Sequence, residues 1–223
     1  MVIISSAGQI KDQIISVGKQ LIDYGLVLAT WGNISCRVPK TDLFLVTPSG
    51  IPYSELQPSD LVQLDLTGEY IEGTRIPSSE SLVHLAIYKK RPDVQAIVHT
   101  HSNYASMFAV VRENIPPILV DMAQMIGGPI KVAKYALSGT QELALNTVEA
   151  LEDRNAVLLA NHGVITTGSN LDEAFNISLL VEKCAQVLLG AKNLGSPFIL
   201  DTKDTLELRE EYLHYYGQKS REE

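Results

Sequence analysis

The segment Val94-Gln95-Ala96-Ile97-Val98-His99-Thr100-His101 begins as an apolar run and ends in two histidines. The run, residues 94–98, predicts a β-strand, and in a strand residues i and i+2 project to the same face. We therefore expect both imidazoles to point into one pocket. A second apolar run, Ala156-Val157-Leu158-Leu159, is followed by His162. Two strands that end in histidines can bring three nitrogen ligands together, which is the protein ligand number of a zinc site with one open position.

The His-x-His pair also has an ordinary explanation. Isolated pairs of this kind occur at surfaces and caps, so the pattern alone leaves a structural role open beside a metal site. His162 shifts the balance toward metal, and the remaining motifs decide between the two.

Apolar periodicity divides the chain into early hairpins and later helices. This order predicts an α/β sandwich with a largely antiparallel sheet rather than a doubly wound parallel one. No internal repeat or linker-like change in composition occurs, so we expect one domain over residues 1–223. The predicted strands are 34–38, 43–46, 61–66, 69–71, 94–98 and 156–159, and the predicted helices are 7–23, 79–90, 104–111, 140–151, 171–193 and 205–216.

Composition narrows the class of protein. The formal net charge is −8 and basic residues form no run, which argues against non-specific nucleic-acid binding. The two cysteines, Cys36 and Cys184, form no metal or disulfide motif, so a reducing cytoplasm is expected. No uninterrupted apolar segment approaches the ~18 residues of a membrane span. We therefore expect a cytoplasmic protein with neither nucleic acid nor membrane as partner.

Three loops carry small polar residues that can bind an anion without a basic side chain. They are Gly32-Asn33, Thr47-Pro48-Ser49-Gly50 and Pro77-Ser78-Ser79-Glu80. The last begins a predicted helix, and a helix N-terminus offers unpaired N–H groups and the positive end of the helix dipole. Each sequence is also common in ordinary turns and caps, so singly each favours a structural role.

Glu80, in the first turn of that helix, has two interpretations. It either complements the helix dipole or places a carboxylate beside the metal as a base. His84 lies one turn further along the same face and competes as a ligand. It is the weaker candidate, because a histidine inside a helix is more often a satisfied core or interface residue. The same holds for His214 near the C-terminus.

Five motifs together resemble the class II aldolase/adducin family in order and spacing, over nearly the whole chain. Within that family the fuculose-phosphate aldolases are the most similar branch. The resemblance implies a three-layer αβα sandwich and a cyclic homotetramer with active sites at subunit interfaces. The motifs are Gly32-Asn33-x-Ser35, Thr47-Pro48-Ser49-Gly50, Pro77-Ser78-Ser79-Glu80, His99-Thr100-His101 and Asn161-His162-Gly163.

The resemblance also implies a role for each motif residue. His99, His101 and His162 become the ligands of one Zn²⁺ per subunit. Glu80 becomes the catalytic acid/base and a candidate fourth ligand in the resting site, and Tyr216 a second catalytic residue. The implied phosphate-binding positions are Gly32, Asn33, Ser49, Gly50, Ser78 and Ser79.

The implied activity is that of a zinc-dependent aldolase, an aldehyde-lyase of carbohydrate metabolism. The partner is a small phosphorylated sugar, a ketose 1-phosphate similar to L-fuculose 1-phosphate, cleaved to dihydroxyacetone phosphate and an aldehyde. In this scheme zinc acts as a Lewis acid and Glu80 shuttles a proton at the carbon that was C3.

Two positions depart from the fuculose-phosphate aldolase pattern. Those enzymes carry a tyrosine, contributed across the interface, that helps to protonate the oxygen of the leaving aldehyde; here the position is Val120, followed by Asp121. Lys219 stands near Tyr216 where they have arginine. The identity of the proton donor is therefore open. We expect a related ketose 1-phosphate, with a different or smaller aldehyde portion.

The family leaves other activities open. L-ribulose-5-phosphate 4-epimerases share the zinc site but usually carry aspartate at the position of Glu80, so Glu80 favours the aldolase. A methylthioribulose-phosphate dehydratase belongs to the same family. The non-catalytic, adducin-like interaction module is the weakest alternative, because that branch lacks the metal ligands that this chain has.

Overall fold

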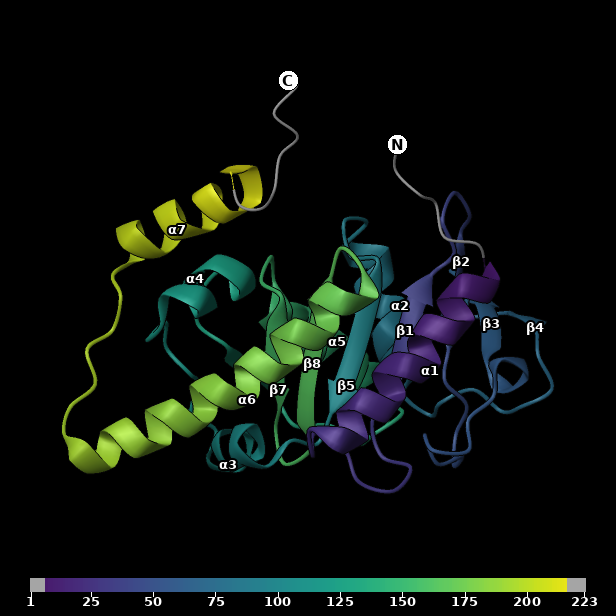
Figure 1. Ribbon diagram of the computed structural model, residues 1–223, viewed down its shortest axis with the longest axis horizontal. Coiled ribbons are helices and arrows are strands. Elements are labelled where there is room, and N and C mark those ends of the chain that lie inside the picture. The colour runs from purple at the N-terminus through teal and green to yellow at the C-terminus, as the bar shows by residue number, and fades with distance from the viewer. Residues whose placement is uncertain (1–6, 216–223) are drawn as a thin grey trace.

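One sheet of eight strands forms the centre of the structure, a computed structural model that describes residues 7–215 (Figure 1). The strands are β1 (Asn33–Arg37), β2 (Leu43–Val46), β3 (Val62–Asp65), β4 (Tyr70–Glu72), β5 (Ala96–Thr100), β6 (Lys131–Ala133), β7 (Ala156–Leu159) and β8 (Gly163–Gly168). The helices are α1 (Ala7–Asp23), α2 (Ser81–Lys90), α3 (Asn103–Val111), α4 (Val120–Ile126), α5 (Gln141–Leu151), α6 (Leu171–Leu194) and α7 (Thr202–Tyr215), with a 3₁₀ turn η1 (Pro58–Asp60).

The sheet is mixed but mostly antiparallel. Its strand order is β4-β3-β2-β1-β5-β8-β7-β6, and only β6 and β7 run parallel to each other. The predicted α/β class and largely antiparallel sheet are thus confirmed. The histidine strand β5 lies between β1 and β8, where His99 pairs with Asn33 on one side and Ile165 on the other. Both edges of β5 are covered, so its residues are held in a fixed register.

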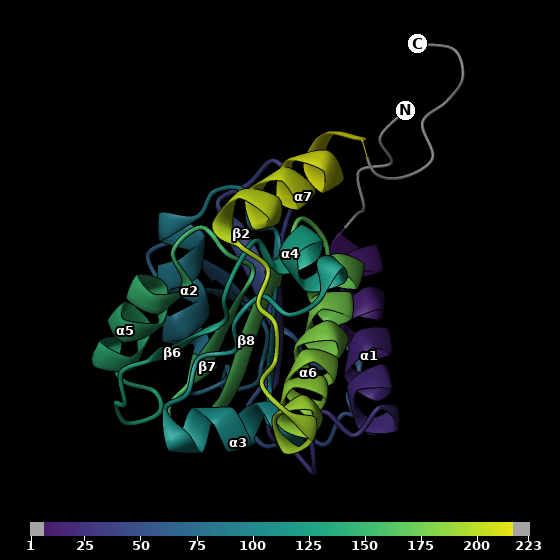
Figure 2. The same cartoon turned by 90° about the vertical axis from the view of Figure 1, so that its left-hand side faces the viewer.

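Helices pack against both faces of this sheet (Figure 2). The α1–α6 face buries one apolar cluster, which includes Val98 of β5. The α2–α5 face buries another, which includes Ile97 of the same strand. Because neighbouring strand residues point to opposite faces, His99 shares the face of Ile97 and turns toward α2. The alternation of β5 therefore directs the first histidine to the helix that begins beside Glu80.

α6 is long and apolar enough to cross a membrane by length and composition alone. Its apolar side chains instead pack in the protein core, where Ala174, Ile177 and Val181 are fully buried. A core helix meets the same composition test, so α6 is weak evidence for a membrane span.

Most predicted elements are present, with shifted ends. The predictions 7–23, 43–46 and 156–159 coincide with α1, β2 and β7. β5 extends through Thr100, so His99 lies inside the strand rather than after it. The helix predicted at 79–90 begins at Ser81, with Glu80 as its N-cap residue.

Three elements were not predicted: α4, β6 and β8. α4 and β6 are short, and their burial in the folded protein stabilises them rather than any strong local pattern. β8 did carry a signal, because residues 164–167 are all β-branched. No strand was predicted after Asn161-His162-Gly163, and β8 begins at the last residue of that motif.

Candidate active site

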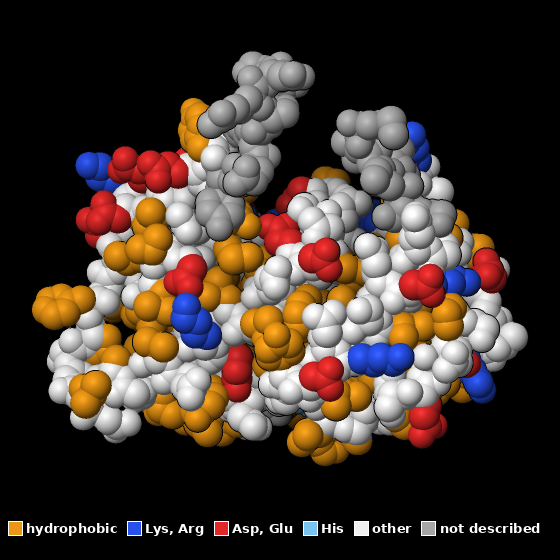
Figure 3. Space-filling view, viewed as in Figure 1, with side chains coloured by type: hydrophobic (Ala, Val, Ile, Leu, Met, Phe, Trp, Pro, Cys, Tyr) orange, Lys and Arg blue, Asp and Glu red, His pale blue; other side chains and the backbone are white. Residues whose placement is uncertain are grey.

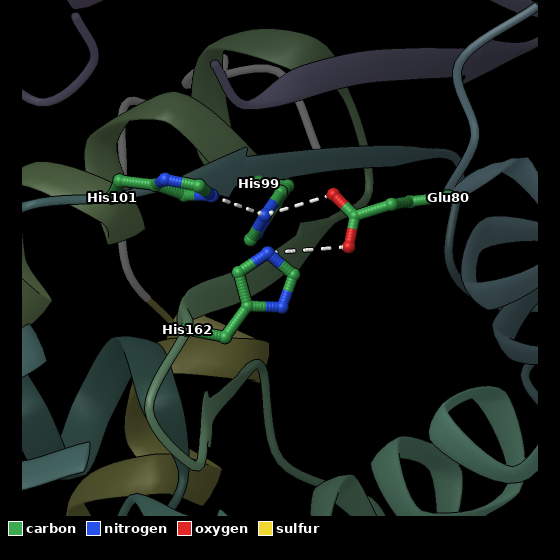
Figure 4. A group of neighbouring side chains, drawn as sticks. All are labelled: Glu80, His99, His101 and His162. Carbon is green, nitrogen blue, oxygen red and sulfur yellow. Dashed lines mark hydrogen bonds and ion pairs between the residues drawn. The ribbon is translucent and has the colours of Figure 1, made fainter. Parts of the chain in front are cut away.

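Three histidines and one glutamate meet above β5 (Figure 4). His99 lies within β5, and His101 directly follows it. His162 comes from the tight turn between β7 and β8, where Asn161 has a positive φ of 54°. Glu80 reaches the group from the N-terminus of α2. The hairpin and the helix start thus deliver the two distant members of the group to the pair on β5.

The four side chains point their ligand atoms at one another. His101 Nε2 lies 3.0 Å from His99 Nε2. Glu80 Oε2 lies 3.1 Å from His99 Nε2, and Glu80 Oε1 lies 3.3 Å from His162 Nε2. All four ligand atoms fall within 4.8 Å of one another, so the group could hold a metal ion. The sequence prediction brought together the same four residues.

A hydrogen bond from the ring of His99 to the backbone indicates whether the three histidines and Glu80 could bind a metal. Its Nδ1 lies 2.8 Å from the carbonyl oxygen of Val164. A carbonyl oxygen only accepts, so Nδ1 carries the proton and donates. The lone pair of the neutral ring is then on Nε2, which faces the other three side chains. Backbone support of this kind orients histidine ligands in metal sites, so the residues fit a metal.

The electrostatics of the group agree with this fit. Burial and the neighbouring His99 lower the pKa of His101 to about 3 and that of His162 to about 4. Burial opposes the ionised form of Glu80, but His99 and His162 beside it hold the pKa of its carboxyl well below the usual value. Burial likewise opposes the charged form of His99, whose pKa Glu80 raises. His101 and His162 are thus neutral beside an ionised carboxylate, as metal binding requires, and a metal would displace the proton that Glu80 favours on His99.

Two glycines let the backbone approach the histidines. A Cβ on Gly163 would collide with the carbonyl oxygen of Thr100 and lie 3.1 Å from His99 Cε1. Gly32 has a φ of +78°, and a Cβ there would lie 2.6 Å from the carbonyl oxygen of His99. The packing around β5 therefore requires glycine at both positions. For Gly32 this is a second role, in addition to the predicted one in an anion-binding loop.

A cavity of about 250 Å³ opens beside the cluster. All six predicted phosphate-binding positions line it, together with Glu80, His101 and His162. The lining residues are Thr30, Trp31, Gly32, Asn33, Pro48, Ser49, Gly50, Ser78, Ser79, Glu80, His101, Ser138 and His162.

The two serine loops are fastened to each other by backbone hydrogen bonds. The amide of Ser49 donates to the carbonyl of Ile76 at 3.0 Å, and the amide of Ser78 donates to the carbonyl of Thr47 at 3.1 Å. Ser78 Oγ also accepts from the amide of Glu80 at 3.3 Å. These bonds hold Ser49 and Ser79 on one wall of the cavity, near the N-terminus of α2.

Three cavity residues were missed by the sequence prediction, namely Thr30, Trp31 and Ser138, and two of them contact the metal-type group. Trp31 stacks on His101, with ring centroids 6.1 Å apart. Ser138 Oγ donates to Glu80 Oε1 at 3.0 Å across 58 positions of the chain. No local sequence pattern predicts either contact.

The remaining candidate residues lie elsewhere. His84 is fully buried and bonded through both ring nitrogens, outside the metal-type group. His214 is on the exposed α7 beside Glu210. Val120 begins α4 and does not line the cavity. Tyr216 and Lys219 lie outside the described residues.

Residues 12–189 match the family model described as Class II Aldolase and Adducin N-terminal domain. The chain belongs to the class II aldolase and adducin family. It is 40% identical to a 5-deoxy-D-ribulose 1-phosphate aldolase of Bacillus thuringiensis, over 94% of this chain and 97% of that protein. It is 35% identical to an L-fuculose phosphate aldolase of Escherichia coli, over 94% and 96% of the two chains.

A solved structure of an L-fuculose 1-phosphate aldolase superposes with a TM-score of 0.89 at 41% identity, covering 92% of this chain and 96% of that one. The predicted family and enzyme class, a class II aldolase, are therefore confirmed. Class II aldolases are metal-dependent, and the group of Glu80 and three histidines could hold a metal ion.

Proposed function

We propose that this class II aldolase cleaves a ketose 1-phosphate to dihydroxyacetone phosphate and an aldehyde. One observation carries the proposal: a three-histidine, one-glutamate group borders a cavity whose other wall is built from the small residues of three loops. The group suits a metal and an acid/base, and the loops suit a phosphate. A sugar phosphate is the class of molecule that needs both together.

His99, His101 and His162 would hold the metal, for which we propose Zn²⁺, one per subunit, with Glu80 as a fourth ligand before substrate binds. Histidine nitrogens with a carboxylate are a ligand set that zinc accepts. The ion supplies Lewis-acid polarisation of the substrate's carbonyl and hydroxyl oxygens.

The chain's own residues bind the phosphate and move the proton. The hydroxyls of Ser49, Ser78 and Ser79 and the amides of Gly50 and Ser79 offer donors to the phosphate, and the first turn of α2 adds the positive end of its dipole. Gly32 and Asn33 complete the phosphate site from the other side. When the C3–C4 bond breaks, its electron pair stays on C3, and the C4 hydroxyl releases its proton as C4 becomes the aldehyde carbonyl. Glu80, which is ionised at rest, takes up a proton and delivers it to C3, so the cleavage consumes no net proton.

The named relatives and Val120 together narrow the substrate. One relative acts on 5-deoxy-D-ribulose 1-phosphate and another on L-fuculose phosphate. Val120 replaces the tyrosine expected in the fuculose-phosphate aldolase pattern. We infer a ketose 1-phosphate with a small apolar end, of the 5-deoxypentulose type, ahead of L-fuculose 1-phosphate.

The proposal includes the setting of the enzyme. A single three-layer αβα domain over residues 1–223 is supported by the helices on both faces of the sheet (Figure 2). A cytoplasmic homotetramer with sites at subunit interfaces, and with Tyr216 in the catalytic group, follows the family resemblance. Apolar side chains reach the surface over much of one face (Figure 3), and Leu194 and Phe198 are 93% and 97% exposed, as expected of residues covered on assembly.

A panel of ketose 1- and 5-phosphates tests the proposal. Release of dihydroxyacetone phosphate from a 1-phosphate, abolished by chelation, is the expected result. Epimer formation from L-ribulose 5-phosphate without cleavage would establish the 4-epimerase alternative, and water loss from methylthioribulose 1-phosphate the dehydratase. A protein that binds no metal and converts no substrate would be the adducin-like interaction module.

A further inference from the structure

A chain of buried polar side chains leads from the protein core to Glu80. Tyr88 and His84 lie on α2, and Ser35 and Asn33 lie on β1. Ser35 Oγ is 2.8 Å from Tyr88 Oη and 2.6 Å from His84 Nδ1. His84 Nε2 is 2.6 Å from Asn33 Oδ1, and Asn33 Nδ2 is 3.0 Å from Glu80 Oε2. None of the four side chains before Glu80 is more than 3% exposed, so water does not compete for these bonds.

The carboxylate end fixes the direction of each hydrogen bond. An ionised carboxylate only accepts, so Asn33 turns its amide nitrogen to Glu80 and its oxygen to His84. The amide oxygen only accepts, so His84 donates from Nε2. Burial lowers the pKa of His84 to about 3, so the ring is neutral and its Nδ1 accepts from Ser35. Ser35 in turn accepts from the hydroxyl of Tyr88.

This direction leaves the amide of Asn33 a single orientation. Turning it over would place its oxygen against the Glu80 carboxylate and its NH₂ against the N–H of His84. Both contacts would be repulsive. They are also shielded from water, and a buried polar group without a hydrogen-bond partner is the most destabilising kind. The carboxylate sets this orientation, and His84 stabilises it by donating to the amide oxygen, although His84 does not line the cavity itself.

The second carboxylate oxygen has a different kind of support. Ser138 Oγ donates to Glu80 Oε1 from the half-exposed loop before α5. The buried chain thus holds one oxygen from inside the fold, and a loop residue holds the other from the cavity side. Together they fix the plane of the carboxylate.

We propose that His84 is a positioning residue of the active site: through Asn33 it holds the Glu80 carboxylate in the orientation needed to move a proton at the substrate. The kinetic consequence rests on the proposed function, whereas the hydrogen-bond direction does not. A histidine that only satisfies the core would contribute to stability alone.

The first test is spectroscopic. Histidine-selective ¹⁵N NMR of the metal-loaded protein, with the His84 signals assigned by their loss in His84→Gln, should show a neutral ring protonated on Nε2 at neutral pH. Tyr88→Phe deletes only the far hydroxyl and should leave this tautomer unchanged. A ring protonated on Nδ1, or on both nitrogens, would overturn the proposal whatever the enzyme's substrate.

The second test is kinetic and uses a matched control. His84→Leu should lower kcat about 10- to 100-fold, as for other supports of metal-site side chains, with a smaller change in KM. His84→Gln, which can still donate to Asn33, should recover part of the loss. Val83→Ala alters the neighbouring buried residue of α2 but removes none of the hydrogen bonds between Tyr88 and Glu80. It should therefore keep the kcat of the wild type.

The outcomes separate the two proposals. Equal kcat in His84→Leu and Val83→Ala, at matched loss of stability, would make His84 an ordinary core residue. If the wild type cleaves no ketose phosphate, the proposed function fails, while the NMR result still decides the role of His84. If His84→Leu does not fold, the tautomer and the His84→Gln kinetics decide.

Discussion

Trp31 stacks on His101 at the wall of the active site, with ring planes inclined by 25° and centroids 6.1 Å apart. It is the chain's one tryptophan. Trp31 is 55% exposed, and its stacking on His101 makes its emission sensitive to a change there. The protein thus contains an intrinsic reporter beside one of the candidate metal ligands.

Adding Zn²⁺ or Co²⁺ to chelator-treated protein should change the fluorescence of Trp31. The change should saturate at about one ion per chain, because residues 7–215 contain one group of side chains that could hold a metal. His101→Ala should abolish saturable binding, measured also by elemental analysis. His214→Ala, which removes an exposed histidine outside the site, should bind metal as the wild type does. Metal binding that survives in His101→Ala would contradict the ligand assignment.

Glu80→Gln should keep the fold and the metal but lower the cleavage rate by about 10²- to 10⁴-fold, because an amide cannot exchange a proton with the substrate carbon. Steady-state kinetics on a cleaved ketose phosphate, with metal content measured on the same sample, check this. Glu142→Gln, which neutralises an exposed carboxylate on α5, is the matched control. Near-normal rates in Glu80→Gln would remove Glu80 as the acid/base.

Gly163→Ala should destabilise the protein by about 1–3 kcal/mol, the usual cost of overpacking. The added methyl group would collide with the Thr100 carbonyl and press on the rings of His99 and His101. Metal affinity should fall as well, because both rings would have to move. Thermal or chemical unfolding and a metal titration measure the two effects.

Gly190→Ala is the control for this substitution. A Cβ at Gly190, on an exposed position of α6, meets no heavy atom within 4 Å. Alanine there should raise stability by about 0.5–1 kcal/mol, because glycine is the poorer helix former. If Gly163→Ala and Gly190→Ala change the stability by similar amounts, the packing around His99 does not require glycine at position 163.

Local signals predicted the parts of the fold that depend on short stretches of sequence. Thr140 caps α5 as expected, with its hydroxyl accepting from the amide of Leu143 at 3.2 Å. The His-x-His spacing on β5 and the shared order of the motifs identified the metal-type group. These features can be predicted because side chains alternate between the two faces of a strand and because certain residue types are preferred at the start of a helix.

The parts that were missed depend on contacts between distant segments. Ser138 meets Glu80 only because the loop before α5 lies over the start of α2. His84 was the weaker candidate ligand, and its hydrogen bonds agree with the core residue that was favoured, but its partners Ser35 and Asn33 were not predicted. The pairing of β1 with β5 makes that arrangement, and no spacing within α2 predicts it.

Acid should weaken the protein partly through Glu152, which lies between two cations. Its carboxylate is 2.5 Å from both Arg154 Nη1 and Lys131 Nζ. Hydrogen bonds from Arg154 and Lys131 lower its pKa from 4.5 to about 2. The unfolded chain therefore binds the proton more readily than the folded one. The stabilisation is complete above the unfolded pKa and disappears as the pH falls toward the folded value.

The free energy of unfolding of wild type and Glu152→Gln should accordingly differ more at about pH 7 than at about pH 3. The side chain is 45% exposed, so solvent screening limits the difference to about 1 kcal/mol or less. Glu55→Gln, which removes one exposed carboxylate elsewhere on the protein, is the matched control. The difference in the free energy of unfolding between wild type and Glu152→Gln should become smaller in acid. If it does not, Arg154 and Lys131 do not favour the ionised carboxylate in the folded state, and acid weakens the fold through other groups.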